Sequence, residues 1–256
     1  MIKVGIVDIK GGLGNQLFQL SFAKYLKSQG IKVYLDTSFF NSNHIFPRKL
    51  ELDLSQFGFK EVKFKNNFIF RTFDSVFVED DSFDNSDLKF INRFVGYYQN
   101  LKYVKLIKED LYKILKLDTA NKNKDLVALH IRKTDYSIIG QELSDLYYQN
   151  AINEILKINN KLQFDIFTDD ENLTLDNNIY RNINKIYKPL PEQSAIDVIK
   201  LMINYKNYIL ANSSFSALAA YISPIGNQLV MYPNPWWKNS NVSLKGIPSS
   251  WIKVKN

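Results

Sequence analysis

The sequence predicts an α/β protein made of two domains, each with a parallel sheet. Segments typical of strands alternate with segments typical of helices along most of the 256 residues. Such alternation favours parallel strands covered by helices on both faces. The most linker-like stretch, residues 118–125, lies between two such series. We therefore expect an N-terminal domain over residues 1–122 and a C-terminal domain over residues 123–256.

The composition is that of an ordinary globular protein, with 45% hydrophobic and 23% charged residues. Cysteine is absent, which excludes disulfides and thiolate chemistry. The N-terminus lacks a signal-peptide pattern and no stretch approaches about 18 apolar residues, so we expect a soluble cytoplasmic protein. The net charge of +7 favours anionic partners. Because the lysines are scattered and no nucleic-acid motif is present, we expect no nucleic acid among those partners.

A strand, a glycine-rich turn and a helix open the chain. Residues 3–8 and 31–35 are typical of strands, and the helix between them ends at Gly30. The turn GGLGNQL at 11–17 therefore joins a strand to a helix in a βαβ unit. Glycines at such a turn let the backbone approach a ligand, and the helix N-terminus offers free N–H groups to an anion.

This turn resembles a dinucleotide fingerprint only in part. Gly12 and Gly14 have the required spacing, and Asp36 lies where a ribose-binding carboxylate is expected. Leu17 replaces the third glycine, which normally permits close helix–strand packing. An NAD site and a purely structural glycine turn both stay open as interpretations.

The remainder of the N-terminal domain is less regular. Residues 37–71 are typical of a long loop bordering a substrate cleft, with strand-like alternation over 60–71. Residues 94–99 (FVGYYQ) predict a short aromatic strand, and residues 103–117 predict a helix.

The stretch that begins the C-terminal domain carries the strongest chemical signal. Residues 126–131 predict a buried strand that contains His130. Arg132, Lys133, Asp135 and Tyr136 follow at once, where a parallel strand opens onto a ligand crevice. Two cations, a carboxylate and a phenol suit a phosphate-bearing ligand that must be deprotonated nearby. The alternative is a sheet end closed by an Arg–Asp ion pair.

Strands and helices continue to alternate to the end of the chain. We expect strands at 162–167, 183–187, 208–211 and 228–231, and helices at 144–156, 194–202 and 217–222. The polar clusters follow the strands directly, so they should converge on one crevice at the carboxyl edge of the sheet.

Two of these clusters have more than one interpretation. Residues 212–216 (NSSFS) suit a diphosphate at a helix N-terminus, or they form a plain N-cap. Asp169 and Asp170 suit Mg²⁺, hydrogen bonding to a base or ribose, or helix capping. The aromatic segment 232–237 either stacks on a sugar ring or packs against the domain.

Four motifs in series resemble glycosyltransferase family 11, the α-1,2-fucosyltransferases. They are GGLGNQLFQ at 11–19, HIRKTDY at 130–136, FTDD at 167–170 and ANSSFSALAAY at 211–221. The resemblance implies a GT-B-like fold, with two Rossmann-like domains whose parallel sheets face a central cleft. It also implies GDP-fucose as the donor and an inverting, metal-independent transfer with no cofactor. Lys133-Thr134 and Ala217-Leu218 depart from the arginine–glycine and paired tryptophans usual in the family.

The resemblance assigns roles to individual residues. Arg132 is expected to clamp the departing diphosphate, and Asp135 or Glu142 to act as the general base. Asp135 has the alternative role of holding Arg132 in an ion pair, and His130 that of a core histidine. The expected substrate-binding residues are Gly12, Gly14, Asn15, Gln16, His130, Lys133, Tyr136, Asp170, Asp197, Asn212, Ser213, Ser214, Phe215 and Ser216.

The expected reaction moves fucose to a β-linked galactose in lipopolysaccharide O-antigen synthesis. A galactose-containing acceptor attached to a lipid agrees with a basic, peripheral protein at the inner membrane face. Two other function classes stay open at this point. They are a NAD-dependent α/β enzyme and a non-catalytic module that binds nucleotide sugars.

Overall fold

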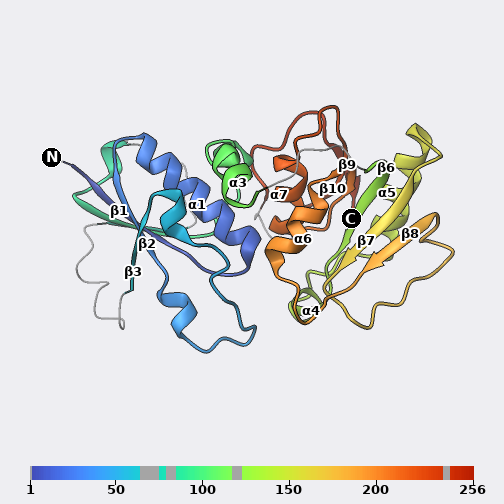
Figure 1. Ribbon diagram of the computed structural model, residues 1–256, viewed down its shortest axis with the longest axis horizontal. Coiled ribbons are helices and arrows are strands. Elements are labelled where there is room, and N and C mark those ends of the chain that lie inside the picture. Colours follow the sequence, from blue (N-terminus) through green and yellow to red (C-terminus); the bar gives the residue numbers. More distant parts are fainter. Residues whose placement is uncertain (1, 64–74, 79–84, 117–122, 239–242) are drawn as a thin grey trace. The chain divides into compact units, whose positions relative to one another are not determined.

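The computed structural model describes residues 2–63, 75–78, 85–116, 123–238 and 243–256. The chain divides into two compact units, Met1–Lys116 and Leu117–Asn256, each of which is described by itself (Figure 1). In both units all paired strands run parallel, which confirms the predicted α/β class. The expected boundary at 122 lies outside the described residues, as does most of the linker-like stretch. The expected cleft between the domains stays a prediction.

The first unit contains a five-stranded sheet in the order β3-β2-β1-β5-β4. The strands are β1 (Val4–Asp8), β2 (Lys32–Asp36), β3 (Lys60–Val62), β4 (Ser75–Val78) and β5 (Ile91–Val95). The central strand β1 pairs with β2 on one side and β5 on the other, so the glycine turn after β1 lies at the middle of the sheet. Short 3₁₀ helices, η1 (Ser38–Asn41) and η2 (Leu54–Phe57), follow β2.

Helix α1 (Leu13–Ser28) packs on this sheet through an aromatic cluster. The Phe22 ring stacks on Tyr98 at a centroid distance of 3.9 Å and meets Phe94 edge-on at 5.5 Å. Close packing also needs Gly5 on β1, because a Cβ there would lie 3.2 Å from both Ile31 and Phe94. The predicted βαβ unit is therefore present, and its core is largely aromatic.

Two expected elements of the first unit differ in the structure. The aromatic strand predicted at 94–99 starts earlier, as β5, and ends at Val95, and Tyr98 then takes a left-handed φ of 48°. The helix predicted at 103–117 is two helices, α2 (Leu101–Val104) and α3 (Lys108–Ile114). Asn100 starts α2 by accepting a hydrogen bond from the Lys102 N–H. The strand-like residues 64–71 lie outside the described ranges.

The second unit contains a six-stranded sheet in the order β11-β10-β9-β6-β7-β8. The strands are β6 (Asn123–Ile131), β7 (Gln163–Thr168), β8 (Ile183–Tyr187), β9 (Tyr205–Ile209), β10 (Leu229–Asn234) and β11 (Ile252–Lys255). The helices are α4 (Thr134–Ile138), α5 (Asp145–Ile158), α6 (Ala195–Met202) and α7 (Ser214–Ile222). Helix α5 and the central strands share one apolar core.

The sequence predicted most of these elements, but four of them differ. Strand β11 and the short helix α4 were not expected, because both are short and carry no clear apolar period. Strand β9 lies three residues before the predicted position and α7 begins at Ser214 rather than 217, because Ser213 acts as its N-cap.

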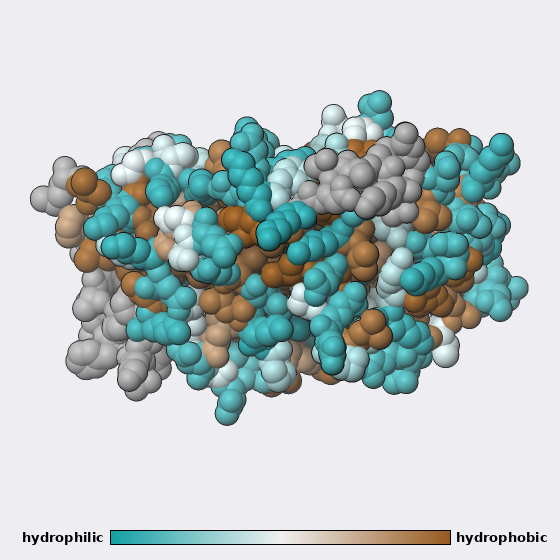
Figure 2. Space-filling model, in the orientation of Figure 1, coloured by the Kyte–Doolittle hydropathy of each residue, from teal (hydrophilic) through white to brown (hydrophobic). Residues whose placement is uncertain are grey.

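Hydrophilic residues cover most of the face drawn in Figure 2, with hydrophobic residues between them. None of the helices in the described ranges is long and apolar enough to cross a bilayer.

Candidate active site

The strand order of the second unit locates its ligand crevice. The chain runs from β6 outward to β7 and β8, and then returns to the other side of β6 as β9. Open α/β sheets bind ligands where the strand order reverses, outside the carboxyl ends of the two strands. Here those ends are followed by Arg132 after β6 and Asn212 after β9. The two segments meet directly, since the Tyr136 hydroxyl donates to the Asn212 carbonyl at 3.3 Å.

Arg132 follows β6 at this reversal point and contacts two carboxylates. Its Nη2 atom is 2.7 Å from Asp135 Oδ1, and its Nη1 atom is 3.1 Å from Asp169 Oδ2. The guanidinium carbon lies 5.4 Å from the centre of the Tyr136 ring. Among the residues that the structure describes, none offers a hydrogen-bond partner to the buried Nε. An unpaired buried donor costs about 1–3 kcal/mol, so it marks a position where an acceptor atom is favoured. The structure thus contains the Arg–Asp ion pair that was the alternative interpretation, and leaves one donor of the same side chain unsatisfied.

Asp169, and not Asp170, joins this cluster. Besides Arg132, its carboxylate accepts hydrogen bonds from the Lys133 N–H at 2.8 Å and from the Thr134 hydroxyl. The sequence analysis weighed the Asp169–Asp170 pair but selected Asp170 as the binding residue. Asp170 Oδ1 accepts from the Asn172 N–H at 2.9 Å in a turn and not at the start of a helix, because β8 is the next element after β7, so the helix-capping alternative does not apply. The signal that identifies Asp169 is its place directly after β7.

A second ion pair lies beside the first. Lys133 Nζ is 2.9 Å from Glu142 Oε1, and the Ser137 hydroxyl donates to Glu142 Oε2 at 2.5 Å. The hydrogen bond with Glu142 raises the pKa of Lys133. Burial by itself raises the pKa of Glu142, but the bonds from Lys133 and Ser137 outweigh it and lower that pKa. Both groups therefore stay charged at neutral pH.

His130 is buried at the end of β6 behind Arg132. Burial and, to a smaller extent, the positive charge of Arg132 lower its pKa to about 4, although Asp169 partly opposes them. The ring is therefore neutral at physiological pH. Its Nδ1 atom is buried without a hydrogen-bond partner, and the ring centre lies 6.1 Å from that of Phe215. A neutral imidazole with an unsatisfied nitrogen suits a hydrogen bond to a ligand, and the expected binding role of His130 stays a prediction.

The crevice residue Asn212 is almost fully buried. Its Nδ2 donates to the Gln141 carbonyl at 2.8 Å, while its Oδ1 has no partner. Arg132, His130 and Asn212 thus each carry one buried polar atom without a partner, and all three follow or end the two strands at the reversal point. Buried polar groups are normally satisfied, so these unsatisfied atoms on the two segments mark polar positions that a ligand could satisfy.

The residues at the start of α7 divide into two groups. Ser213 is the N-cap and accepts from the Phe215 N–H, which is the capping alternative. Ser216 is fully buried and donates to the carbonyls of Ala211 and Ser213, so its hydroxyl is used within the chain. Ser214 and Phe215 are partly exposed. They are the members of this group that the structure leaves accessible.

Asp197 follows β8 at the same edge of the sheet, but its carboxylate is used locally. It forms a reciprocal capping box with Ser194 at the start of α6, and these hydrogen bonds lower its pKa. Its expected contact with the donor stays a prediction.

The residues of the glycine turn in the first unit occupy different structural positions. Gly11 takes a φ of 77°, and a Cβ there would lie 2.8 Å from Asn15 Nδ2. Gly12 is the N-cap of α1, and a Cβ there would meet nothing within 4 Å, so space is open beside it. Gly14 is buried inside the helix. Asn15 Oδ1 accepts a hydrogen bond from Gln99 Nε2 at 3.1 Å, which links the turn to the segment after β5.

The two glutamines of this motif are fully buried and hold loops together. Gln16 Nε2 donates to the Gly11 and Lys49 carbonyls, and its Oε1 accepts from the Glu51 N–H. Gln19 joins the ends of β1 and β5, because it accepts from the Lys10 N–H and donates to the Gly96 carbonyl. The amide of Gln16 is thus occupied inside the unit, and its expected contact with a substrate stays a prediction.

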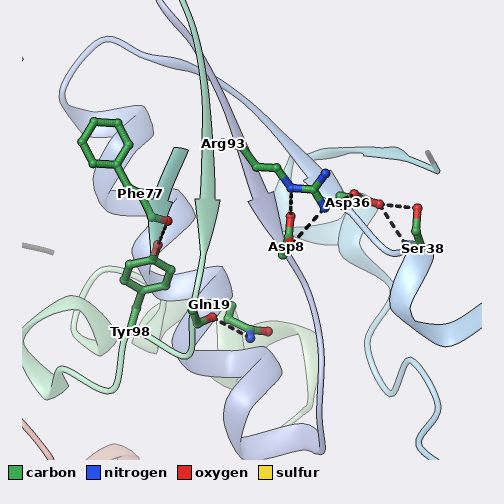
Figure 3. A network of polar contacts seen from close by, with 8 residues as sticks. Asp8, Gln19, Asp36, Ser38, Phe77, Arg93 and Tyr98 are labelled. Atoms are coloured by element: carbon green, nitrogen blue, oxygen red, sulfur yellow. Dashed lines mark hydrogen bonds and ion pairs between the residues drawn. The ribbon is translucent and has the colours of Figure 1, made fainter. Parts of the chain in front are cut away.

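A buried ionic network lies at the carboxyl ends of β1 and β2 (Figure 3). Arg93 of β5 forms a bidentate pair with Asp8 and also contacts Asp36 at 3.1 Å. Burial raises the pKa of Asp8, although Arg93 opposes that effect. Asp36 accepts in addition from the Ser38 N–H and hydroxyl. The carboxylate that the NAD interpretation assigned to a ribose is therefore engaged within the sheet.

Within the described ranges no cluster of three or more histidine, cysteine, aspartate or glutamate side chains has the arrangement of a metal site. The expected metal-independent reaction stays a prediction.

Comparisons with known proteins agree with the geometry. The profile of Glycosyl transferase family 11 matches residues 94–252. An alpha-1,2-colitosyltransferase of Escherichia coli is 26% identical over 99% of this chain and 100% of its own length. The O-antigen biosynthesis glycosyltransferase WbnK of Escherichia coli is 32% identical over 52% of this chain and 45% of its own length.

Among solved structures, NodZ alpha-1,6-fucosyltransferase soaked with GDP-fucose superposes with a TM-score of 0.45 at 13% identity, covering 88% of this chain and 94% of that one. The family match spans more than half of the chain and includes the whole β6–α7 crevice. The chain therefore belongs to glycosyltransferase family 11 and is a glycosyltransferase.

Proposed function

We propose that this glycosyltransferase moves L-fucose from GDP-β-L-fucose to the 2-hydroxyl of a β-linked galactose, with inversion and without a metal ion. The observation that supports this most directly is the unpaired, buried Nε of Arg132 at the reversal point of the second sheet. A planar guanidinium matches the oxygens of a phosphate and stays charged at any working pH.

In the proposed reaction the bond between the sugar and the diphosphate breaks as the acceptor hydroxyl attacks. Negative charge grows on the departing GDP, and Arg132 and Lys133 stabilise that charge. A fixed donor of this kind contributes about 3–4 kcal/mol to a transition state. Asp135 and Asp169 contact the guanidinium on its two terminal nitrogens and hold it in place. The diphosphate would then bind to the remaining donor, Arg132 Nε, and to the exposed side of the Arg132 ion pairs.

The inverting transfer needs a carboxylate to take the proton of the acceptor hydroxyl. The side chain of Asp135 is 14% exposed and pairs with the Arg132 guanidinium, whereas the side chain of Glu142 is 33% exposed. Glu142 is therefore the better placed proton acceptor, and Asp135 is assigned to positioning Arg132. The low pKa of Glu142 keeps it unprotonated, as a general base must be.

One relative suggests a second donor. Colitose is fucose without the hydroxyl at carbon 3, and the relative that matches 99% of this chain is named an alpha-1,2-colitosyltransferase. The name of WbnK likewise supports a role in O-antigen synthesis. The two donors differ by one hydroxyl, so a site that hydrogen-bonds the 3-hydroxyl of fucose rejects colitose strongly, whereas an apolar site does not.

The acceptor is proposed to be a lipid-linked glycan that ends in galactose. The net charge of +7 supports contact with an anionic membrane surface. A flotation assay with vesicles that contain anionic lipid tests this part separately.

The test of the proposed function offers GDP-fucose and GDP-colitose, in parallel, to a panel of β-galactosides with and without a chelator. The expected product carries an α-1,2 linkage, and the chelator leaves its rate unchanged. If product forms only with GDP-colitose, the sugar that this protein transfers is colitose and not fucose. Binding of GDP-fucose without transfer or slow hydrolysis would instead favour a non-catalytic binding module.

A further inference from the structure

The side-chain amide of Gln141 joins two segments that lie 97 residues apart in the sequence. Its Oε1 accepts from the Lys238 N–H at 2.9 Å, and its Nε2 donates to the Lys238 carbonyl at 3.3 Å. The backbone of Gln141 is also engaged. Its N–H donates to the Tyr136 carbonyl at 2.8 Å, and its carbonyl accepts from Asn212 Nδ2 at 2.8 Å. One residue therefore connects α4, the segment after β9 and the segment after β10.

The bonds of Gln141 place two groups of the proposed site. Glu142 is the next residue, and its carbonyl accepts a hydrogen bond from Lys238 Nζ. Trp237 precedes Lys238, and its ring centre lies 5.8 Å from that of Tyr136. The Tyr136 ring in turn contacts the guanidinium of Arg132. The pair of hydrogen bonds between Gln141 and Lys238 is called the clasp below. It sets the positions of the Glu142 carboxylate and of the Trp237 ring beside Arg132.

Hydrogen bonds rather than apolar packing hold this part of the site. None of residues 132–142 is buried, and Leu143 is the next residue that joins the core. The side chains of Ile138 and Ile139 are 73% and 47% exposed. Segments with few buried apolar contacts open easily, so the polar bonds that remain determine how well they are ordered.

We propose that Gln141 is a positioning residue for sugar transfer, which fixes Glu142 and Trp237 through its clasp with Lys238. The inference rests on the proposed function, in which Glu142 accepts the proton. Gln141 itself contacts no substrate. It lowers the barrier by keeping the carboxylate and the aromatic ring in one arrangement.

The test compares Gln141→Met, Gln141→Glu and the control Gln163→Met in the full chain. Methionine keeps the length of glutamine and makes neither bond, whereas glutamate keeps the oxygen that accepts from Lys238. Gln163 is an exposed glutamine at the opposite, amino end of β7. Four quantities are measured: kcat, KM for the acceptor, Kd for GDP, and hydrogen exchange of the amides in residues 137–143.

For Gln141→Met the expected result is a fall in kcat of at least about tenfold, because small displacements of positioned groups are costly. Kd for GDP should change less than about threefold, since the clamp residues remain, and exchange in 137–143 should rise at least about tenfold as the segment loosens. The kcat and the exchange rates of Gln141→Glu should lie between those of Gln141→Met and those of the wild type. The control should match the wild type in all four quantities.

Three outcomes would overturn the inference. They are a kcat of Gln141→Met at the wild-type value, unchanged exchange in 137–143, or a parallel loss of kcat, GDP affinity and thermal stability, which indicates a general structural role. A wild-type chain that transfers no sugar in the same assay contradicts the proposed function instead. The exchange data distinguish that failure from the failure of the clasp.

Discussion

The guanidinium of Arg132 lies 3.1 Å from the carboxylate of Asp169, although the two residues are supplied by different strands. Arg132 follows β6 and Asp169 follows β7, and these strands are neighbours in the sheet. Asp169 also accepts from the Lys133 N–H at 2.8 Å. One carboxylate therefore fixes both the side chain of the clamp and the backbone that follows it.

Replacing Asp169 by asparagine removes the charge that holds Arg132 and places an amide N–H where an acceptor is needed. We expect kcat to fall about tenfold or more and the free energy of unfolding to fall by about 1–3 kcal/mol. Steady-state kinetics and urea denaturation measure the two effects. The control is Asp176→Asn, where an exposed carboxylate accepts hydrogen bonds from Asn178. Equal behaviour of the two variants would contradict the assigned role of Asp169.

The two carboxylates near the clamp should respond differently to neutralisation. Glu142→Gln removes the proposed base, so kcat should fall by about 10²–10⁴ while GDP still binds. Asp135→Asn should weaken GDP binding as well, because Asp135 positions Arg132. Kinetics and calorimetric titration with GDP separate the two cases. A larger loss of kcat in Asp135→Asn, with normal GDP affinity, would assign the base to Asp135 instead.

The same assignment predicts the acidic limb of the pH–rate profile. A general base must be unprotonated, and hydrogen bonds from Lys133 and Ser137 lower the pKa of Glu142 despite its burial. Activity should therefore persist as pH falls to 4.5, the ordinary pKa of a glutamate, and be lost only below it. Loss of activity between pH 5 and 7 in a protein that remains folded would contradict this.

His130 makes the stability of the second unit depend on pH. Burial lowers its pKa to about 4 in the folded protein, against 6.5 as the ordinary value. The unfolded chain therefore binds a proton between these values and the folded chain does not, so this residue destabilises the fold as pH falls below 6.5 and has no effect above it. At pH 5 this lowers the free energy of unfolding by about 2 kcal/mol.

Urea denaturation at pH 7.5 and pH 5 checks this expectation. The difference in the free energy of unfolding between the two values should be about 2 kcal/mol smaller in His130→Asn, whose side chain does not titrate. The same difference in the variant and the wild type would show that His130 is protonated in the folded protein.

Gln16→Leu tests the structural role of the glycine-turn motif. The change keeps the volume but leaves the Gly11 and Lys49 carbonyls and the Glu51 N–H without their partner. We expect a loss of about 1–3 kcal/mol in the free energy of unfolding. Gln29→Leu, at an exposed position after α1, should change it by less than about 0.5 kcal/mol. A neutral Gln16→Leu would mean that the loop is held in another way.

Sequence patterns predicted the two parallel sheets, because buried parallel strands and their helices leave long apolar and helical periods. They also predicted that Arg132 follows a buried parallel strand, as it does after β6, while its role at a ligand stays a prediction. They did not distinguish Asp169 from Asp170, because both follow β7 and only the backbone direction at the strand end decides between them. The clasp between Gln141 and Lys238 was also missed, because a contact between positions 97 residues apart leaves no periodic signal.

Gln16 of the first unit also shows what sequence patterns cannot predict. Its place beside a glycine turn suggested a ligand contact for Gln16, but the folded chain buries this residue completely. A buried amide with all its bonds made inside the chain has the same sequence signal as one that faces a ligand. Only the hydrogen-bond partners separate the two cases.

The turnover of Arg132→Ala with GDP-fucose and a β-galactoside tests the central claim most directly. If Arg132 neutralises the departing diphosphate, kcat should fall by about 10²–10³ in a protein that still folds, and Arg132→Lys should recover only part of the rate because it restores the charge without the fork. A kcat for Arg132→Ala within about tenfold of the wild-type value would contradict the account, because one lost transition-state donor costs more than that.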